Sequence, residues 1–240
     1  MLPFSVAQSR QCSLSMLDFN VTAPRHQMVE QQIRAGGVLD PAVLAVFDEI
    51  PRHTFVSDTF QKLAYADCEI PLDHGEMMLT PAFQARLASA LNLAGTERIL
   101  EIGTGSGYLT ACLACLSREI TTVDLHPDFI QAAKQRHQAL ALPHPVRYLA
   151  ADGHTLPAEL KDERFDAIAL TGSLYRPEPS FYEALEADGR LFMVLGSDLV
   201  QSAHLIRRLG DSSSFEETRL FETRIPPLKN VPKPPEFRFS

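Results

Sequence analysis

The sequence predicts an α/β fold in which a doubly wound, mostly parallel sheet carries helices on its faces. From residue 98 to residue 196, short apolar strands alternate with helical segments through short connections, which is the pattern of parallel βαβ units. The first of these strands, RILEIG, leads into a turn with glycine at every second position, Gly103, Gly105 and Gly107. In a doubly wound sheet, ligands bind beside such strand ends.

The segment before the sheet predicts three helices and a long loop. Residues 28–37 predict a short helix that two glycines end. Residues 40–50 predict a second helix, with an aspartate cap, proline at its first position and another proline after it. Residues 53–79 show no sustained period and predict a structured loop, which in a compact domain is usually functional. Thr80 and Pro81 mark the cap and first turn of the third helix.

The remaining elements follow from the same patterns. The expected strands are residues 98–103, 119–124, 146–152, 164–172 and 190–196, and the expected helices are 106–117, 126–141 and 177–189. Residues 199–225 predict a strand or helix and then a final antiparallel strand, and the proline-rich residues after them predict an extended run over the surface. The predicted organisation is a loosely ordered arm (1–27), helices and substrate loop (28–97), an α/β core forming one domain with them (98–225) and a proline-rich tail (226–240).

Composition narrows the class of protein. The chain has 240 residues, 45% of them hydrophobic, and a formal net charge of −8, which is typical of a soluble globular protein. An acidic surface repels phosphate backbones, so nucleic acid is not an expected partner. No apolar run is long enough to span a membrane and no secretory signal is visible, so we expect no membrane partner and a cytoplasmic location. Cys112 and Cys115 lie in an apolar helical run without a second cysteine pair, so no metal site is predicted.

Four consecutive strand ends carry groups suited to a nucleoside. The glycine turn brings backbone close to a ligand, but Tyr108 stands where a dinucleotide fingerprint needs its third glycine. Asp124 ends the second strand, where its two oxygens match a ribose diol. Asp152 follows the third strand, placed to face an adenine amino group, and Thr171 ends the fourth. Asp124 alone is an ordinary helix cap and Asp152 an ordinary turn residue, but their common register favours a cofactor site.

These residues carry a family resemblance. LEIGTGSGY, VD and ADG resemble the S-adenosylmethionine site of class I methyltransferases. In order and spacing, MVEQQIRAGGVLDPAVLAVFDEIPRHTFV, LAYADCEIPLDHGE, ILEIGTGSGY and DGRLFMVLG are similar to the protein-L-isoaspartate O-methyltransferase family over residues 28–225. The segment before the glycine turn is the part most particular to this family. The resemblance implies a seven-stranded Rossmann-like sheet, S-adenosyl-L-methionine as cofactor, and as its binding residues Glu101, Gly103, Thr104, Gly105, Gly107, Asp124, Leu125, Asp152, Gly153 and Thr171.

The resemblance weakens at the substrate loop. The family loop reads close to G-Q-T-I-S-x-P, whereas residues 75–81 read GEMMLTP. Two hydroxyls that would hold the acceptor carboxylate are missing, and a glutamate adds negative charge. The expected substrate loop consists of Gly75, Glu76, Met77, Met78 and Leu79. The candidate catalytic residues are Thr80, the only hydroxyl left, and His74, although a helix cap and an exposed loop histidine are their ordinary roles.

The resemblance therefore implies a carboxyl methyltransferase that acts on isoaspartyl residues of damaged proteins, and we expect a monomer or weak dimer. A carboxylate acceptor is ionised at neutral pH, with a reference pKa of about 3.9, so it needs no general base. One alternative is a methyltransferase of the same fold with a different, possibly small-molecule, acceptor, which the apolar loop favours. Another is a non-catalytic cofactor-binding protein, which the intact glycine turn and both acids disfavour.

Overall fold

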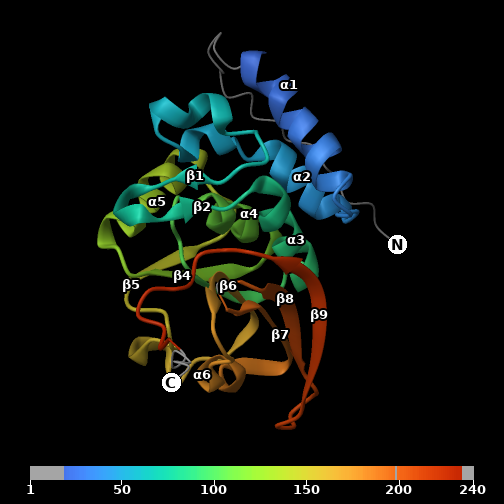
Figure 1. Ribbon diagram of the computed structural model, residues 1–240, viewed down its shortest axis with the longest axis vertical. Helices are drawn as coiled ribbons and strands as arrows, with labels where there is room; N and C mark the ends of the chain where they lie inside the picture. Colours follow the sequence, from blue (N-terminus) through green and yellow to red (C-terminus); the bar gives the residue numbers. More distant parts are fainter. Residues whose placement is uncertain (1–18, 198, 234–240) are drawn as a thin grey trace, which may run out of the picture.

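A computed structural model of the chain describes residues 19–197 and 199–233. Its centre is a seven-stranded sheet in the order β5-β4-β3-β6-β7-β8-β9 (Figure 1). The strands are β3 (Arg98–Ile102), β4 (Glu119–Asp124), β5 (Val146–Ala150), β6 (Phe165–Leu174), β7 (Leu185–Gly196), β8 (Gln201–Arg208) and β9 (Phe215–Thr223). β3 to β7 are parallel to one another, and β8 and β9 each pair antiparallel with the strand before. The predicted doubly wound, mostly parallel sheet is confirmed.

The alternation of side chains along the central strands creates two cores. Ile99, Ala167 and Ala169 belong to the larger cluster, together with buried residues of the helices before and after β3. Leu100 and Ile168 point to the opposite face and join a second cluster, because successive side chains of a strand alternate between faces. Both faces of the central strands are therefore covered, which is why these strands read as continuous apolar runs.

The helices lie on these two faces. They are α2 (Pro41–Glu49), α3 (Pro81–Leu91), α4 (Tyr108–Leu116), α5 (Pro127–Leu140) and the short α6 (Pro179–Glu183). Asp40 accepts from the backbone N–H of Ala42 at 2.8 Å and Thr80 from that of Phe83 at 3.2 Å, so both predicted caps are confirmed. Within the described residues, no helix is long and apolar enough to cross a membrane.

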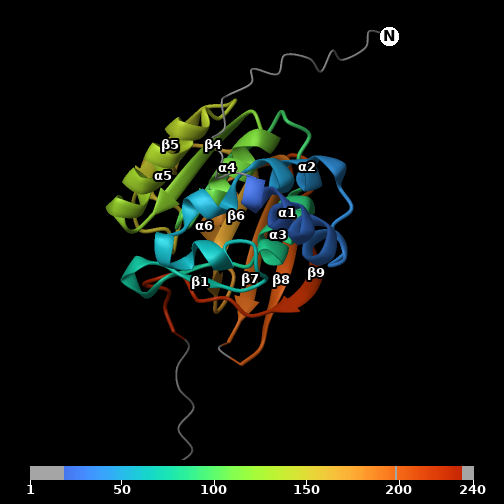
Figure 2. The same ribbon diagram turned by 90° about the horizontal axis from the view of Figure 1, so that it is seen from above.

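The N-terminal segment is more ordered than predicted. Residues 19–27, expected as part of a loose arm, belong to helix α1 (Phe19–Met28), which continues as a π-helix over Val29–Arg34 (Figure 2). Met28, Val29 and Ile33 are buried in the larger core, so tertiary packing fixes a helix whose earlier part has no continuous apolar stripe. The rest of the predicted arm, residues 1–18, lies outside the described residues.

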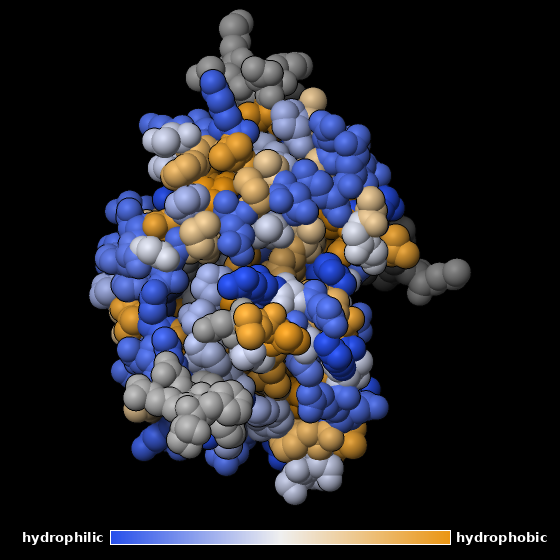
Figure 3. Space-filling view, viewed as in Figure 1, coloured by the Kyte–Doolittle hydropathy of each residue, from blue (hydrophilic) through white to orange (hydrophobic). Residues whose placement is uncertain are grey.

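Two other segments differ from expectation. The predicted helix over residues 177–189 ends at Glu183, because Leu185 is already buried in β7 and pairs with Phe165. The loop 53–79 folds into short 3₁₀ turns and a small antiparallel ribbon of β1 (Ile70–Pro71) and β2 (Met77–Met78). On the face seen in Figure 3, hydrophobic residues lie in separate patches among hydrophilic ones.

Candidate active site

One cavity lies over the carboxyl ends of β3, β4 and β6. This is the switch point of the sheet, because the chain proceeds from β3 outward through β4 to β5 and then returns to β6 on the other side. Segments from the whole chain meet there. The predicted site residues that line the cavity are Glu76, Met77, Met78, Leu79, Gly103, Thr104, Gly105, Asp124, Leu125, Asp152, Gly153 and Thr171.

The glycine turn between β3 and α4 needs glycine for local reasons. Gly103 has φ +99°, and a Cβ there would lie 2.1 Å from Oγ1 of Thr171. That hydroxyl donates toward the backbone oxygens of Ile102 and Gly103 at 2.9 Å each. Gly105 has φ +50° and lines the cavity. Left-handed backbone at both positions favours glycine, and glycine adds no side chain to the cavity at these two positions.

Asp124 lies directly beside the glycine turn. Its Oδ2 accepts from the N–H of Gly105 at 2.8 Å and its Oδ1 from that of His126 at 2.9 Å. Burial raises the pKa of this carboxyl, against the lowering effect of those two hydrogen bonds. Each carboxylate oxygen has two acceptor positions, so both oxygens retain capacity toward a ligand.

Asp152 and Thr171 complete the predicted strand ends. Asp152 accepts from Asn230 Nδ2 at 2.7 Å and from the backbone N–H of His154 at 3.1 Å. Burial alone would raise the pKa of Asp152, but its hydrogen bonds, chiefly from His154 and Asn230, lower it below the usual range. Thr171 lines the cavity, yet its hydroxyl is committed to holding the glycine turn.

Glu101 and Gly107 do not line the cavity, although both were expected at the cofactor. The Glu101 side chain lies fully buried behind the turn, where its Oε2 accepts from Thr110 at 2.5 Å and from Thr122 at 2.7 Å. Burial raises the pKa of Glu101 to about 7. At Gly107, an added Cβ would lie 2.7 Å from Cβ of Ala133, so this glycine permits close packing between helices.

The loop that faces the glycine turn rests on a buried arginine. Arg52 is fully buried and donates from Nη2 to the Leu79 carbonyl at 2.6 Å and from Nη1 to Gln84. Its guanidinium lies 4.8 Å from the ring centroid of Tyr108, and burial lowers its pKa. Thr80 does not line the cavity, since its hydroxyl caps α3. Arg52 lies within the PRHTFV run, but nothing in the sequence marked it as the support of the loop.

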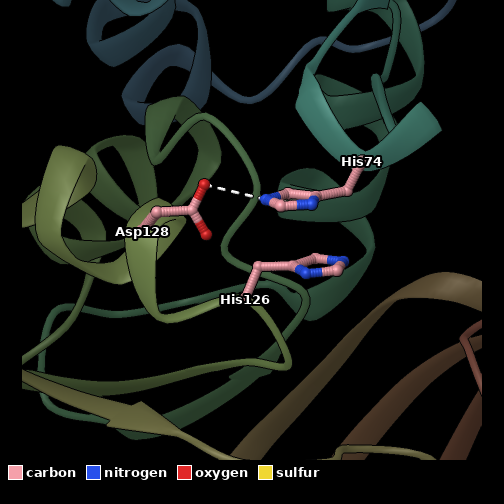
Figure 4. A group of neighbouring side chains, drawn as sticks. All are labelled: His74, His126 and Asp128. Carbon is pink, nitrogen blue, oxygen red and sulfur yellow. Dashed lines mark hydrogen bonds and ion pairs between the residues drawn. The ribbon is translucent and has the colours of Figure 1, made fainter.

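His74 belongs to a different group beside the cavity (Figure 4). Its ring stacks on that of His126, with centroids 4.0 Å apart and planes 3° apart, and its Nε2 lies 2.8 Å from Asp128 Oδ2. In the described part of the chain these three side chains are the one group with metal-capable donors close together, within 4.8 Å. The in-plane lone pairs of stacked parallel rings do not point at a shared position, so we assign no metal to them. His74 and Gly75 lie outside the cavity lining.

The C-terminal segment was missed by the sequence analysis as part of the site. Residues 226–229 cross the sheet ends beside the β1–β2 ribbon and line the cavity (Figures 1 and 2). Ser173 donates its N–H to the Pro226 carbonyl at 2.9 Å and accepts from the N–H of Leu228 at 3.0 Å. Residues 226–228 of the expected extended run are bound to β6, but the chain turns at residues 229–230, and residues 234–240 of the predicted tail lie outside the described residues. Further lining residues that carried no sequence signal are Leu72, Gln84, Ser106, Leu109, His126, Phe129 and His154.

Comparison with known proteins agrees with this architecture. The chain is 35% identical over 208 residues to a protein-L-isoaspartate O-methyltransferase of a Picosynechococcus species, covering 86% of this chain and 90% of the relative. It is 37% identical over 210 residues to protein-L-isoaspartate O-methyltransferase 1 of Rhodopseudomonas palustris, covering 86% and 83%.

Solved structures share the fold. A Plasmodium falciparum structure assigned as a protein-L-isoaspartate O-methyltransferase, in complex with S-adenosyl-L-homocysteine, superposes with a TM-score of 0.72 at 21% identity, covering 85% of this chain and 98% of that one. Another protein-L-isoaspartate O-methyltransferase structure gives a TM-score of 0.72 at 22% identity, covering 85% and 65%. The family model for protein-L-isoaspartate(D-aspartate) O-methyltransferase matches residues 23–230. The chain therefore belongs to the protein-L-isoaspartate(D-aspartate) O-methyltransferase family, as its sequence predicted.

Proposed function

We propose that this protein is an S-adenosylmethionine-dependent methyltransferase that esterifies the α-carboxylate of isoaspartyl residues in proteins. The observation that carries the proposal is that a single cavity joins the glycine turn and Asp124 to the loop Glu76–Leu79. One end of that cavity suits a nucleoside cofactor and the other faces the loop in which this family receives its acceptor. Family membership supports the same assignment.

The residues present fit the cofactor. The glycine turn admits a ligand close to backbone, and the buried carboxylate of Asp124 has acceptor capacity for a ribose diol. Asp152 offers oxygens to an adenine amino group, while Leu125 and Phe129 provide apolar wall. When bound, the cofactor supplies an electrophilic methyl group on a sulfonium. Because the transferred group is a methyl group and not a proton, Asp124 serves to hold the cofactor and takes no part in proton transfer.

For methyl transfer the protein has to position the cofactor and the acceptor and to exclude water. A carboxylate oxygen of the acceptor would bond to the methyl carbon as the methyl–sulfur bond broke, and the electron pair of that bond would remain on sulfur. No proton is transferred, because the acceptor is already ionised at neutral pH. The proposal therefore assigns no acid or base role to Thr80 or His74, which lie outside the cavity lining.

A second candidate acceptor follows from the lining of the loop. Met77, Met78 and Leu79 give this end of the cavity an apolar wall, and an unpaired carboxylate is costly to bury against such a surface. A methyltransferase with a different, more apolar acceptor is therefore the alternative.

The test uses purified protein, S-adenosylmethionine with a radiolabelled methyl group, and paired peptides that differ only in an aspartyl or isoaspartyl linkage. Base-labile label on the isoaspartyl peptide alone is the expected result. Cofactor binding in a calorimeter without label on either peptide would instead favour the alternative acceptor. Label on neither peptide nor on any small-molecule acid or alcohol, with cofactor bound, would indicate a non-catalytic binding protein.

A further inference from the structure

The cavity holds three acidic side chains and one strong cation. Glu76, Asp124 and Asp152 line it, and Lys229 is the only lysine or arginine among the described lining residues. The ammonium group of Lys229 lies 2.8 Å from Oε1 of Glu76. A lysine ammonium has three N–H donors, so beside this ion pair it has donors for a second carboxylate. The Lys229 side chain is 48% exposed and that of Glu76 23% exposed, so the cation stands at the mouth of the cavity.

Hydrogen bonds on both sides of Lys229, one from the backbone of Leu228 and one from the side chain of Asn230, fix its position. Leu228 donates its N–H to Ser173 on β6 at 3.0 Å. On the other side, Asn230 donates to Asp152 at 2.7 Å. The Leu228 side chain fills the space over Gly172, where a Cβ would lie 2.6 Å from Leu228 Cδ2. Lys229 is thus held between the substrate loop and the cofactor end of the cavity.

The loop itself offers the acceptor little. Met77, Met78 and Leu79 have no hydrogen-bond donor in their side chains, and Thr80 lies outside the cavity lining. A carboxylate that enters a partly apolar cavity requires a partner. Within the lining that the structure describes, Lys229 is the one lysine or arginine that can meet it.

We propose that Lys229 binds the α-carboxylate of the methyl acceptor and replaces the hydroxyls that the substrate loop lacks. This inference rests on the proposed function, because it assumes an acceptor with a free carboxylate. Glu76 holds the lysine in place before the acceptor arrives and competes with it afterwards. The pair Glu76–Lys229 therefore sets both the position and the strength of acceptor binding, and Lys229 makes the enzyme selective for an anionic acceptor.

The test measures binding and turnover in parallel. One peptide carries an isoaspartyl residue, and a matched peptide carries a carboxamide in place of that residue's α-carboxylate. Affinities are measured by titration in the presence of S-adenosyl-L-homocysteine, which has no methyl group to transfer. The variants are K229M, which removes the charge, K229R, which keeps it, and E76Q, which removes the competing acid. K233M is the control, since Lys233 is exposed on the same segment and is not among the cavity-lining residues.

A charge-assisted hydrogen bond contributes enough to change affinity about tenfold or more. We expect K229M to weaken binding of the isoaspartyl peptide by about that factor, with KM raised to match and affinity for the carboxamide peptide unchanged. K229R and K233M should retain both affinities. E76Q should bind the isoaspartyl peptide more tightly than the unmodified protein, a gain that misfolding cannot produce.

Three outcomes would overturn the inference. The first is an equal loss of affinity for both peptides in K229M. The second is an affinity for the isoaspartyl peptide that K229M leaves unchanged. The third is weaker binding of S-adenosyl-L-homocysteine with the peptide unaffected, which would place Lys229 at the cofactor's own carboxylate. If the unmodified protein methylates no peptide, the proposed function fails. If it also binds the isoaspartyl and carboxamide peptides with equal affinity, the inference about Lys229 fails as well. Methylation with unchanged K229M kinetics refutes the inference alone.

Discussion

Replacing Glu101 with glutamine removes a carboxyl group that lies fully buried behind the glycine turn. Two hydroxyls, from Thr110 and Thr122, donate to its Oε2, while its Oε1 is buried without a partner. Burial raises the pKa of Glu101 from 4.5 to about 7 in the folded chain. As pH rises above 4.5, the unfolded state releases this proton while the folded state still holds it. The contribution of Glu101 to stability is therefore complete below about pH 4.5 and falls as pH rises toward 7.

The magnitude follows from the size of the shift. One pKa unit corresponds to about 1.4 kcal/mol, so the loss through Glu101 is about 3 kcal/mol in all, most of it between pH 5 and pH 8. Glutamine stays neutral throughout and does not contribute this decline. The amide places an unpartnered donor near the Oε1 position, which shifts the stability of E101Q by a constant amount at every pH. The informative quantity is therefore the change with pH of the difference between the two proteins.

Urea unfolding followed by circular dichroism at several pH values from 5 to 8 measures this difference. We expect the free energy of unfolding of E101Q to rise relative to that of the unmodified protein by roughly 2–3 kcal/mol from pH 5 to pH 8. Parallel profiles would refute the argument from burial. Because Glu101 does not line the cavity, E101Q should also bind S-adenosyl-L-homocysteine with unchanged affinity. A tenfold loss of affinity for S-adenosyl-L-homocysteine in E101Q would instead support the sequence-based prediction that Glu101 contacts the cofactor.

The remaining predictions concern the cavity directly. Asp124→Asn should weaken S-adenosyl-L-homocysteine binding about tenfold or more in calorimetry, because it removes a charged acceptor; unchanged affinity would remove Asp124 from the cofactor site. Gly103→Ala should destabilise the fold by about 2 kcal/mol or more, through its φ of +99° and the contact with Thr171. Adding Thr171→Ala should restore part of that loss in urea unfolding, and no recovery would contradict the predicted clash. Met77→Thr with Leu79→Ser should raise methylation of an isoaspartyl peptide while lowering stability by about 2–5 kcal/mol, since Leu79 is 5% exposed. If methylation does not rise, the loop serves another acceptor.

Much of the fold was predictable because local patterns and tertiary packing agree over residues 98–196. Strand residues such as Ile99 and Leu100 face opposite cores, so continuous apolar runs are required there, and they are visible in the sequence. Helix α1 was not predicted, because few of its residues are buried and they form no apolar pattern in the sequence. Its stability comes from contacts made at its end, by Met28 and the residues after it. The helix predicted over 177–189 failed for the opposite reason, since the buried Leu185 fits either a helix or a strand until its partner Phe165 is known.

The residues of the candidate site also fall into those that the sequence predicts and those that it does not. Gly103 and Asp124 were identifiable because a parallel sheet brings the ends of its strands to one edge, so position along the chain specifies position in space. Glu101 lies two residues before Gly103, yet the alternation of the strand turns its side chain into the protein interior. His126 and Lys229 carried no signal, because each reaches the cavity from an irregular segment whose course depends on the folded core.

Glu76 shows why single positions in the loop mislead. Considered alone, a glutamate beside an anionic acceptor is repulsive, and that charge counted against the repair function. The structure pairs it at 2.8 Å with a lysine 153 positions later, at the opposite end of the chain. An ion pair at a cavity mouth contributes little net charge, and its lysine remains able to donate to a second carboxylate. Glu76 supplies no hydroxyl to an acceptor, but it equips the loop to hold a cation. Under the proposed function, the loop and the C-terminal segment together form the acceptor site, so neither can be evaluated without the other.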